Sequence, residues 1–162
     1  MVCVVFEDER GVASTTHALK VMGSDRTVSS VRREIDCAEK CRGKEGVAQY
    51  VGLGEGTPCV GLLFTPGGGP LSTVCPCVAA RRTAVHRLLD TGVRAALGQW
   101  HRQGIFYRDL HRDNVIVDNA DAPTTMHIVD VESLTIKGHT TDKVFTANDD
   151  LKLLDRVLSL YP

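Results

Sequence analysis

The chain has 162 residues, and its 19 Lys and Arg nearly balance 20 Asp and Glu, giving a formal net charge of −1. About 150 residues make one domain, so a single compact unit with a proper apolar core is expected. A charge this close to zero argues against a nucleic-acid partner bound through a phosphate-neutralising field. No segment has the roughly 18 consecutive apolar residues of a membrane span.

The first six residues are apolar, and the three residues after them, 7–9, are acidic. A secretory signal peptide instead needs a positively charged start and a longer apolar stretch. We therefore expect no signal peptide, no membrane partner and an intracellular protein, in the cytoplasm or nucleus.

The first part of the chain alternates in the manner of strands and includes one helical stretch. Strands are predicted over residues 2–6, 16–22, 47–51 and 59–64. From Thr27 the apolar residues recur at spacings of three and four, which predicts a helix capped by Thr27 or Ser24 and ended by Gly43 and Gly46. The glycine-rich residues 52–56 precede a strand rather than a helix, so we interpret them as a hairpin turn and not as a phosphate-binding loop.

A Gly- and Pro-rich joint at residues 65–70 marks the clearest internal boundary, and a long helix follows it, ending at Gly104. Two short strands are predicted at residues 115–117 and 127–131, and a last helix at residues 150–161. The long helix carries an apolar stripe formed by Val85, Leu88, Leu89, Ala96, Leu97 and Trp100.

This order of elements predicts an α+β chain in two lobes. Residues 1–66 would form a small β-rich lobe with one helix, and residues 67–162 a reduced, mostly helical lobe. A cleft between two lobes is a usual place for a small-molecule site.

Four of the six cysteines could form a zinc site, but their spacings match no standard ligand pattern. They are Cys37, Cys41, Cys75 and Cys77. The expected intracellular compartment disfavours disulfides. We therefore expect neither a zinc ion nor a disulfide.

The strongest chemical signal lies in the second half of the chain. Asp109 and Asn114 are five residues apart in a polar loop, and Asp130 follows at the end of a short strand. Two carboxylates and an amide supply the oxygen ligands that Mg²⁺ prefers. One carboxylate would remain to receive a proton from an attacking hydroxyl. Each residue alone also has an ordinary interpretation as a turn or surface residue.

Taken together, these segments resemble the protein kinase family. Residues 107–114 resemble its catalytic loop, with Tyr107 in place of the usual first His, and residues 130–132 (Asp-Val-Glu) stand where its metal-binding Asp-Phe-Gly lies. Lys20 resembles the strand lysine that holds the phosphates, and Glu34 the helix glutamate that pairs with it. Residues 62–69 resemble the hinge, and residues 148–151 the start of the helix that supports the catalytic loop.

The resemblance implies a two-lobed protein kinase-like fold with ATP and Mg²⁺, or Mn²⁺, as cofactors. Asp109 would be the base, Lys20 would neutralise phosphate charge, Glu34 would hold Lys20, and His111 would donate to the γ-phosphate. The metal would be held by Asn114 and Asp130. The nucleotide would contact Lys20, Leu63, Phe64 and Thr65.

The sequence also departs from the family. The glycine-rich loop over the phosphates is missing, because the chain begins at the strand that would follow it. Glu132 replaces a glycine. Residues 133–148 form a short activation segment without Ala-Pro-Glu, and most substrate-docking helices are absent. A partner protein would then complete the substrate site, or the chain would form a homodimer through exposed core surface.

These features favour an enzyme, a minimal Ser/Thr-type protein kinase that moves the γ-phosphate of Mg-ATP to a hydroxyl of a protein substrate. All the positions expected to be catalytic keep usable side chains. Two alternatives stay open. Asp-Leu-His at 109–111 and Glu132 also suit a small-molecule kinase of the aminoglycoside or choline type. The missing glycine-rich loop suits a pseudokinase that acts as a binding module.

Overall fold

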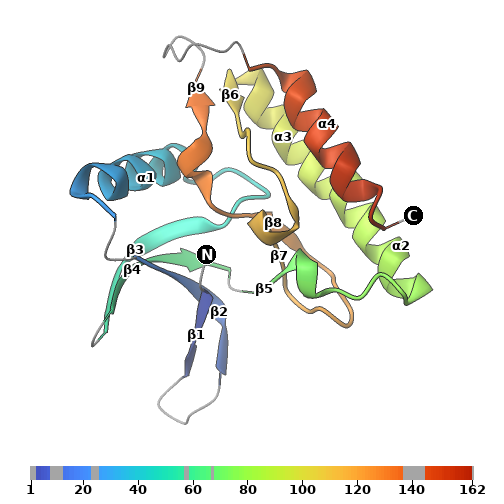
Figure 1. The fold of residues 1–162 in the computed structure, drawn as a ribbon, viewed down its shortest axis with the longest axis horizontal. Coiled ribbons are helices and arrows are strands. Elements are labelled where there is room, and N and C mark those ends of the chain that lie inside the picture. The colour runs from blue at the N-terminus through green and yellow to red at the C-terminus, as the bar shows by residue number, and fades with distance from the viewer. Residues whose placement is uncertain are drawn as a thin grey trace.

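A computed structural model describes residues 3–7, 13–22, 26–56, 59–66, 68–136 and 145–161. The described chain is mixed α+β, with small antiparallel sheets and helices (Figure 1). The larger sheet and one α-helix come from the N-terminal part of the chain, and the other α-helices come from the C-terminal part. Among the described residues, no helix has the length and apolar character needed to cross a membrane.

Four antiparallel strands form the larger sheet, in the order β1-β2-β4-β3. They are β1 (Cys3–Glu7), β2 (Ala13–Val21), β3 (Gln49–Gly56) and β4 (Cys59–Thr65). The central pair is β2 and β4, where Lys20 lies opposite Leu62. A Cβ atom at Gly61 would lie 2.6 Å from the carbonyl oxygen of Lys20, so the glycine lets β4 pass close to β2 at this point.

All four predicted strands are present, but the predicted hairpin turn at residues 52–56 is wrong. These residues belong to β3, where Gly54 pairs with Gly61 and Gly52 with Leu63. Glycine is disfavoured in strands, but pairing with β4 holds the backbone extended here. The glycines therefore lie in the sheet and form neither a turn nor a phosphate-binding loop.

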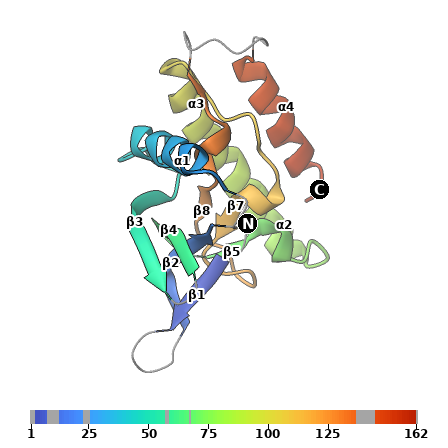
Figure 2. The same ribbon diagram turned by 60° about the vertical axis from the view of Figure 1, so that its left-hand side comes forward.

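The helix α1 (Val28–Lys40) packs against β3 and against the short 3₁₀ helix η4 (Val131–Ser133) (Figure 2). Thr27 caps it as predicted, because its side chain accepts a hydrogen bond of 3.2 Å from the backbone N–H of Ser30. The alternative cap, Ser24, lies outside the described residues. Both Gly43 and Gly46 follow the helix with positive φ angles.

The helical part consists of α2 (Ala79–Leu88), a turn of π-helix η2 (Leu89–Val93) and α3 (Arg94–Arg102), with α4 (Ala147–Leu158) packed beside α3 (Figure 1). Gly104, with φ of 72°, follows the end of α3 as predicted. The predicted apolar stripe is buried except for Leu88, which is half-buried. Its neighbours in the core include Leu154, Val157 and Tyr161.

Short strands connect the helical part to the sheet. One small sheet has the order β5-β7-β8, formed by β5 (Gly69–Pro70), β7 (Val115–Val117) and β8 (Met126–Ile128), and β6 (Ile105–Phe106) pairs with β9 (Thr135–Ile136). Two further 3₁₀ helices are η1 (Leu71–Thr73) and η3 (Arg112–Asn114). The strand predicted at residues 127–131 ends early, at Ile128, because Asp130 has a left-handed backbone.

Of the four cysteines considered for zinc, two are bonded to each other and two are free thiols. A disulfide joins Cys75 and Cys77, so the expectation that no disulfide forms is wrong for this pair, whose sulfur atoms are brought together by a local turn of the chain. Cys37 and Cys41 are buried free thiols. Burial raises the pKa of Cys41 to about 12, which disfavours the thiolate form that a metal needs.

Candidate functional site

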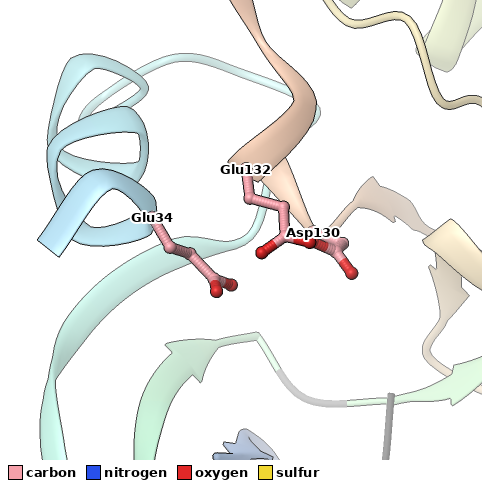
Figure 3. Close-up of side chains that lie close together, drawn as sticks. All are labelled: Glu34, Asp130 and Glu132. Atoms are coloured by element: carbon pink, nitrogen blue, oxygen red, sulfur yellow. The ribbon is translucent and has the colours of Figure 1, made fainter. Parts of the chain in front are cut away.

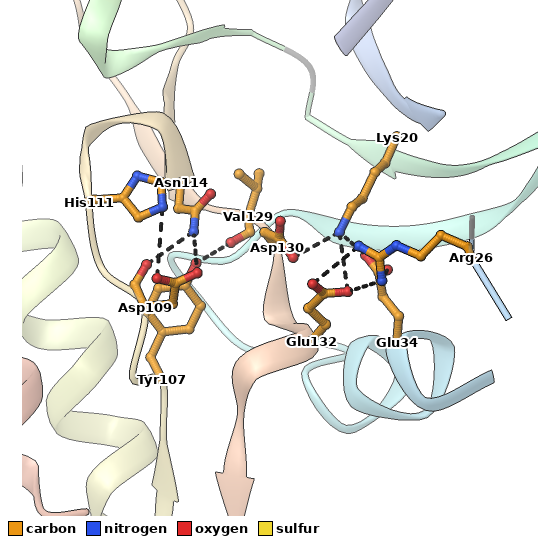
Figure 4. A network of polar contacts seen from close by, with 10 residues as sticks. All are labelled: Lys20, Arg26, Glu34, Tyr107, Asp109, His111, Asn114, Val129, Asp130 and Glu132. Atoms are coloured by element: carbon orange, nitrogen blue, oxygen red, sulfur yellow. Dashed lines mark hydrogen bonds and ion pairs between the residues drawn. The ribbon is translucent and has the colours of Figure 1, made fainter. Parts of the chain in front are cut away.

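The amine of Lys20 lies between two carboxylates from distant parts of the chain (Figure 4). Its Nζ atom is 2.5 Å from Oε1 of Glu34 on α1 and 2.8 Å from Oδ1 of Asp130 beyond β8. Lys20 is 6% exposed and Glu34 is fully buried. The sheet, α1 and the turn after β8 thus bring together three of the residues predicted for the site.

Burial and ion pairing act in opposite directions on the pKa values of Lys20 and Glu34. Burial lowers the pKa of Lys20, but hydrogen bonds to Asp130 and Glu34 outweigh that effect and leave it raised, so the amine stays protonated. Burial raises the pKa of Glu34, and the hydrogen bond from Lys20 only partly opposes this. Its second oxygen, Oε2, has no hydrogen-bond partner. Removing either partner would leave an uncompensated buried charge.

A second ion pair joins the same group from outside. Arg26, just before the α1 cap, binds both carboxylate oxygens of Glu132, at 2.5 Å (Nη1 to Oε2) and 3.2 Å (Nη2 to Oε1). The hydrogen bond from Arg26 lowers the pKa of Glu132. Sequence analysis missed Arg26, because this residue lies 106 positions from its partner and belongs to no motif.

The three carboxylates of Glu34, Asp130 and Glu132 lie close together (Figure 3). One oxygen from each falls within 4.8 Å of the others, a spacing that could hold a metal ion. The ammonium of Lys20 already lies among them, however, at 2.5, 2.8 and 3.8 Å. The group is therefore better described as a charge network closed by Lys20 and Arg26 than as a metal site.

Asp109 and Asn114 lie together in the loop between β6 and β7 (Figure 4). The Asn114 amide nitrogen donates to the Asp109 backbone oxygen at 3.0 Å and to Oδ2 of the Asp109 carboxylate at 3.1 Å. Because the amide nitrogen is used in this way, its oxygen is left to accept another partner or a cation. His111 lies beside them, with Nε2 at 3.9 Å from Oδ1 of Asp109.

A cavity of about 540 Å³ opens over these groups. The described residues that line it are Pro70, Asp109, His111, Asp113, Asn114, Ile116 and Asp130. Oxygens from Asp130 and Asn114 are suited to a hard divalent cation. The half-exposed carboxylate of Asp109 can accept a proton from a bound hydroxyl.

A second cavity, of about 510 Å³, lies next to the same aspartate. The described residues lining it are Arg26, Ser30, Arg33, Arg108, Asp109, Glu132 and Ser133. Among the described residues, Asp109 lines both cavities. A molecule in either cavity would therefore lie next to Asp109.

The helix α4 holds the loop in place through Asp150, which is fully buried. Its Oδ1 accepts from the backbone N–H of Arg108 at 2.7 Å, and its Oδ2 accepts from that of Tyr107 at 2.9 Å. Oδ2 also contacts Nε2 of His101 at 2.9 Å. These bonds accompany a φ of 73° at Arg108, a conformation that needs support from its surroundings. The buried hydroxyl of Tyr107 donates to the backbone oxygen of Val129, which joins the loop to the Asp130 turn.

The residues predicted to contact a nucleotide base lie in β4. Phe64 is buried edge-to-face against Tyr50, at 5.9 Å between ring centroids. Leu63, Phe64 and Thr65 are not among the described residues that line the 540 Å³ cavity, whereas Pro70 is. Their contact with a base stays a prediction. Gly67 of the predicted hinge and residues 137–144 of the predicted activation segment lie outside the described residues.

No protein-family model matches the sequence, and no curated protein matches it.

Proposed function

We propose that this chain is an ATP-dependent phosphotransferase with a two-lobed protein kinase-like fold, most consistent with a minimal Ser/Thr-type protein kinase. The observation that carries the proposal is the Lys20 amine bonded to both Glu34 and Asp130, while Asp130, Asn114 and Asp109 line one cavity. A phosphate-binding cation, metal-binding oxygens and a proton acceptor are the groups that phosphoryl transfer needs.

In the proposed reaction, the acceptor oxygen forms a bond to the γ-phosphorus of ATP as the bond to the bridging oxygen breaks, releasing ADP. Asp109 takes the proton of the acceptor hydroxyl. Lys20 places its positive charge against the phosphates, and Glu34 fixes the position of that charge. Asp130 and Asn114 would hold Mg²⁺ or Mn²⁺, which supplies neutralising charge at the phosphates. Because Lys20 contacts Oδ1 of Asp130, Oδ2 is the oxygen available for a metal.

The two cavities support a division between nucleotide and acceptor. Asn114 and Asp130 line one of them, and the second lies on the side of Arg33 and Ser133. An acceptor hydroxyl in the second cavity would meet Asp109 at the boundary. A small-molecule acceptor is the second candidate, favoured by Glu132, which lines the proposed acceptor cavity where the protein kinases have a glycine.

The test is transfer of label from γ-labelled ATP, with Mg²⁺ or Mn²⁺, to the chain itself and to separate pools of proteins and metabolites. Asp109→Asn should lower turnover by about 10²–10⁴-fold if Asp109 is the base. Asp113→Asn is the matched control, because Asp113 is exposed in the same loop and lines the same cavity.

Label in the protein pool supports a protein kinase, and label in the metabolite pool supports a small-molecule kinase. Equal activity of Asp109→Asn and Asp113→Asn would remove Asp109 from the mechanism. Binding of Mg-ATP without any transfer would instead favour a pseudokinase that serves as a binding module.

A further inference from the structure

We propose that the ion pair between Arg26 and Glu132 is a positioning element, which locks α1 to the turn that carries Asp130 and so presents that carboxylate to the metal. The proposal rests on the proposed function, because it assigns Asp130 to metal binding. Both residues also line the cavity proposed for the acceptor, so the test below measures metal-dependent ATP binding and not transfer to an acceptor.

The geometry is a closed ring of charges (Figure 4). Lys20 bonds Glu34, which α1 carries, and also Asp130, at 2.5 and 2.8 Å. Arg26 and Glu132, which flank α1 and Asp130 in sequence, close the ring with two hydrogen bonds. Three segments of the chain are thus tied at two points, by Lys20 on one side and by Arg26 on the other.

Asp130 is the member of the ring that most needs such support. Its backbone is left-handed, with φ of 59° and ψ of 62°, a conformation that a non-glycine residue holds only when its surroundings impose it. Lys20 restrains its side chain, and Glu132 restrains the turn two residues further on. Without Arg26, the Glu132 carboxylate would keep the longer contact of 3.8 Å between its Oε2 atom and Nζ of Lys20.

The pair also differs from an ordinary surface ion pair. Its two parallel hydrogen bonds fix the orientation of both side chains, as a single contact does not. Both side chains are about two-thirds buried, at 29% and 32% exposed. Arg26 lies 3.8 Å from the unpaired Oε2 of Glu34 as well, so the same guanidinium compensates the buried carboxylate of the Lys20 pair.

The test compares Arg26→Gln, Glu132→Gln and the double variant with the parent chain. The measurement is the Mg²⁺ concentration that gives half-maximal binding of ATP, alongside ATP binding without metal. Each single variant should raise that Mg²⁺ concentration about tenfold and leave metal-free ATP binding unchanged. The double variant should raise it little further than either single variant, since the two residues act as one unit. Arg26→Lys, which keeps the charge but cannot form two parallel bonds, should lie between parent and Arg26→Gln.

Arg42→Gln is the matched control, because Arg42 follows α1 and forms an exposed ion pair with Glu39 outside the site. A second measurement does not depend on nucleotide at all. The backbone N–H of Leu134 donates to the oxygen of Val131 in η4, and its hydrogen exchange should be about tenfold faster in Arg26→Gln and unchanged in Arg42→Gln.

The positioning role is wrong if both single variants need the same Mg²⁺ concentration as the parent chain, or if hydrogen exchange at Leu134 is unchanged in Arg26→Gln. Either result would leave the proposed function intact. Effects that simply add in the double variant would overturn the positioning role too. A parent chain that binds no ATP at any Mg²⁺ concentration would overturn the proposed function, and the metal-presenting role with it.

Discussion

Lys20 faces three carboxylates at once, so its removal should be more damaging than that of any one partner. We expect Lys20→Met to lower the free energy of unfolding by about 3–5 kcal/mol, because the buried Glu34 would lose its hydrogen-bonded partner and keep the weaker 3.8 Å contact with Arg26. Glu34→Gln should lower it by about 1–3 kcal/mol, since Lys20 keeps Asp130. Urea unfolding at pH 7 measures both, and equal losses would contradict this account.

The acid side of the stability profile should depend on Glu132. Its pKa is lowered by the hydrogen bond from Arg26, so the carboxylate stabilises the fold above its unfolded value near 4.5 and loses that contribution as the pH falls through the lowered pKa. The contribution is under about 1 kcal/mol, because the pair is partly exposed. The stability difference between parent and Glu132→Gln should therefore be present at pH 7 and shrink toward pH 3. A difference that is constant with pH would contradict the role of Arg26.

Residues of the site differ in how far sequence alone could place them. Lys20 and Glu34 could be paired in advance because a strand followed by a helix carries them in an order that resembles a known family. Arg26 could not, because a lone arginine before a helix has many solvated alternatives and its partner is over a hundred residues away. The left-handed backbone of Asp130 is likewise imposed by contacts that form only in the folded chain.

At the scale of elements, the connection after α1 depends on one glycine. A Cβ atom at Gly46 would lie 2.5 Å from Cβ of Ala96 on α3, whereas one at Gly43 would meet nothing within 4 Å. Both glycines have φ near 72°, so an alanine at either position would be strained by about 1 kcal/mol. We expect Gly43→Ala to be destabilising by that amount and Gly46→Ala by about 2–4 kcal/mol, through the added overpacking.

Denaturant unfolding of the two variants measures the difference. Ala96→Gly removes the contacting methyl group, so the double variant with Gly46→Ala should lose less stability than the sum of the single variants. If the losses of stability simply add, the close approach to α3 is not the reason that alanine is destabilising at position 46.

The elements themselves were predictable to the extent that local pattern controls them. The Thr27 cap of α1 and the stop at Gly104 follow from chemistry within a few residues. The extension of β3 through Gly52 and Gly54 does not, because only pairing with β4 holds glycines in a strand. The two backbone bonds that Asp150 accepts from the loop also arise from long-range packing of α4.

At the scale of the whole molecule, the sheet and the helices share one core. Leu62 and Phe64 of β4 belong to the same buried cluster as Leu97 and Trp100 of α3. The segment after Gly46 also bonds to β8, with Ala48 donating to the oxygen of Ile128 at 2.9 Å. The charge network around Lys20 therefore spans parts that are already packed together, and a ligand that binds it should stabilise the entire fold.

Mg-ATP should raise the melting temperature of the chain for this reason. At a concentration of 100 times its dissociation constant, a ligand that binds only the folded state adds about 2.7 kcal/mol, which for a domain of this size corresponds to a shift of about 5–10 °C. Asp130→Asn should abolish most of the Mg²⁺-dependent part, because the amide replaces the carboxylate. Asparagine tolerates the left-handed backbone, so the substitution changes the charge while sparing the turn. Thermal unfolding with and without Mg²⁺ separates the two contributions, and a shift that Asp130→Asn leaves intact would place the metal elsewhere.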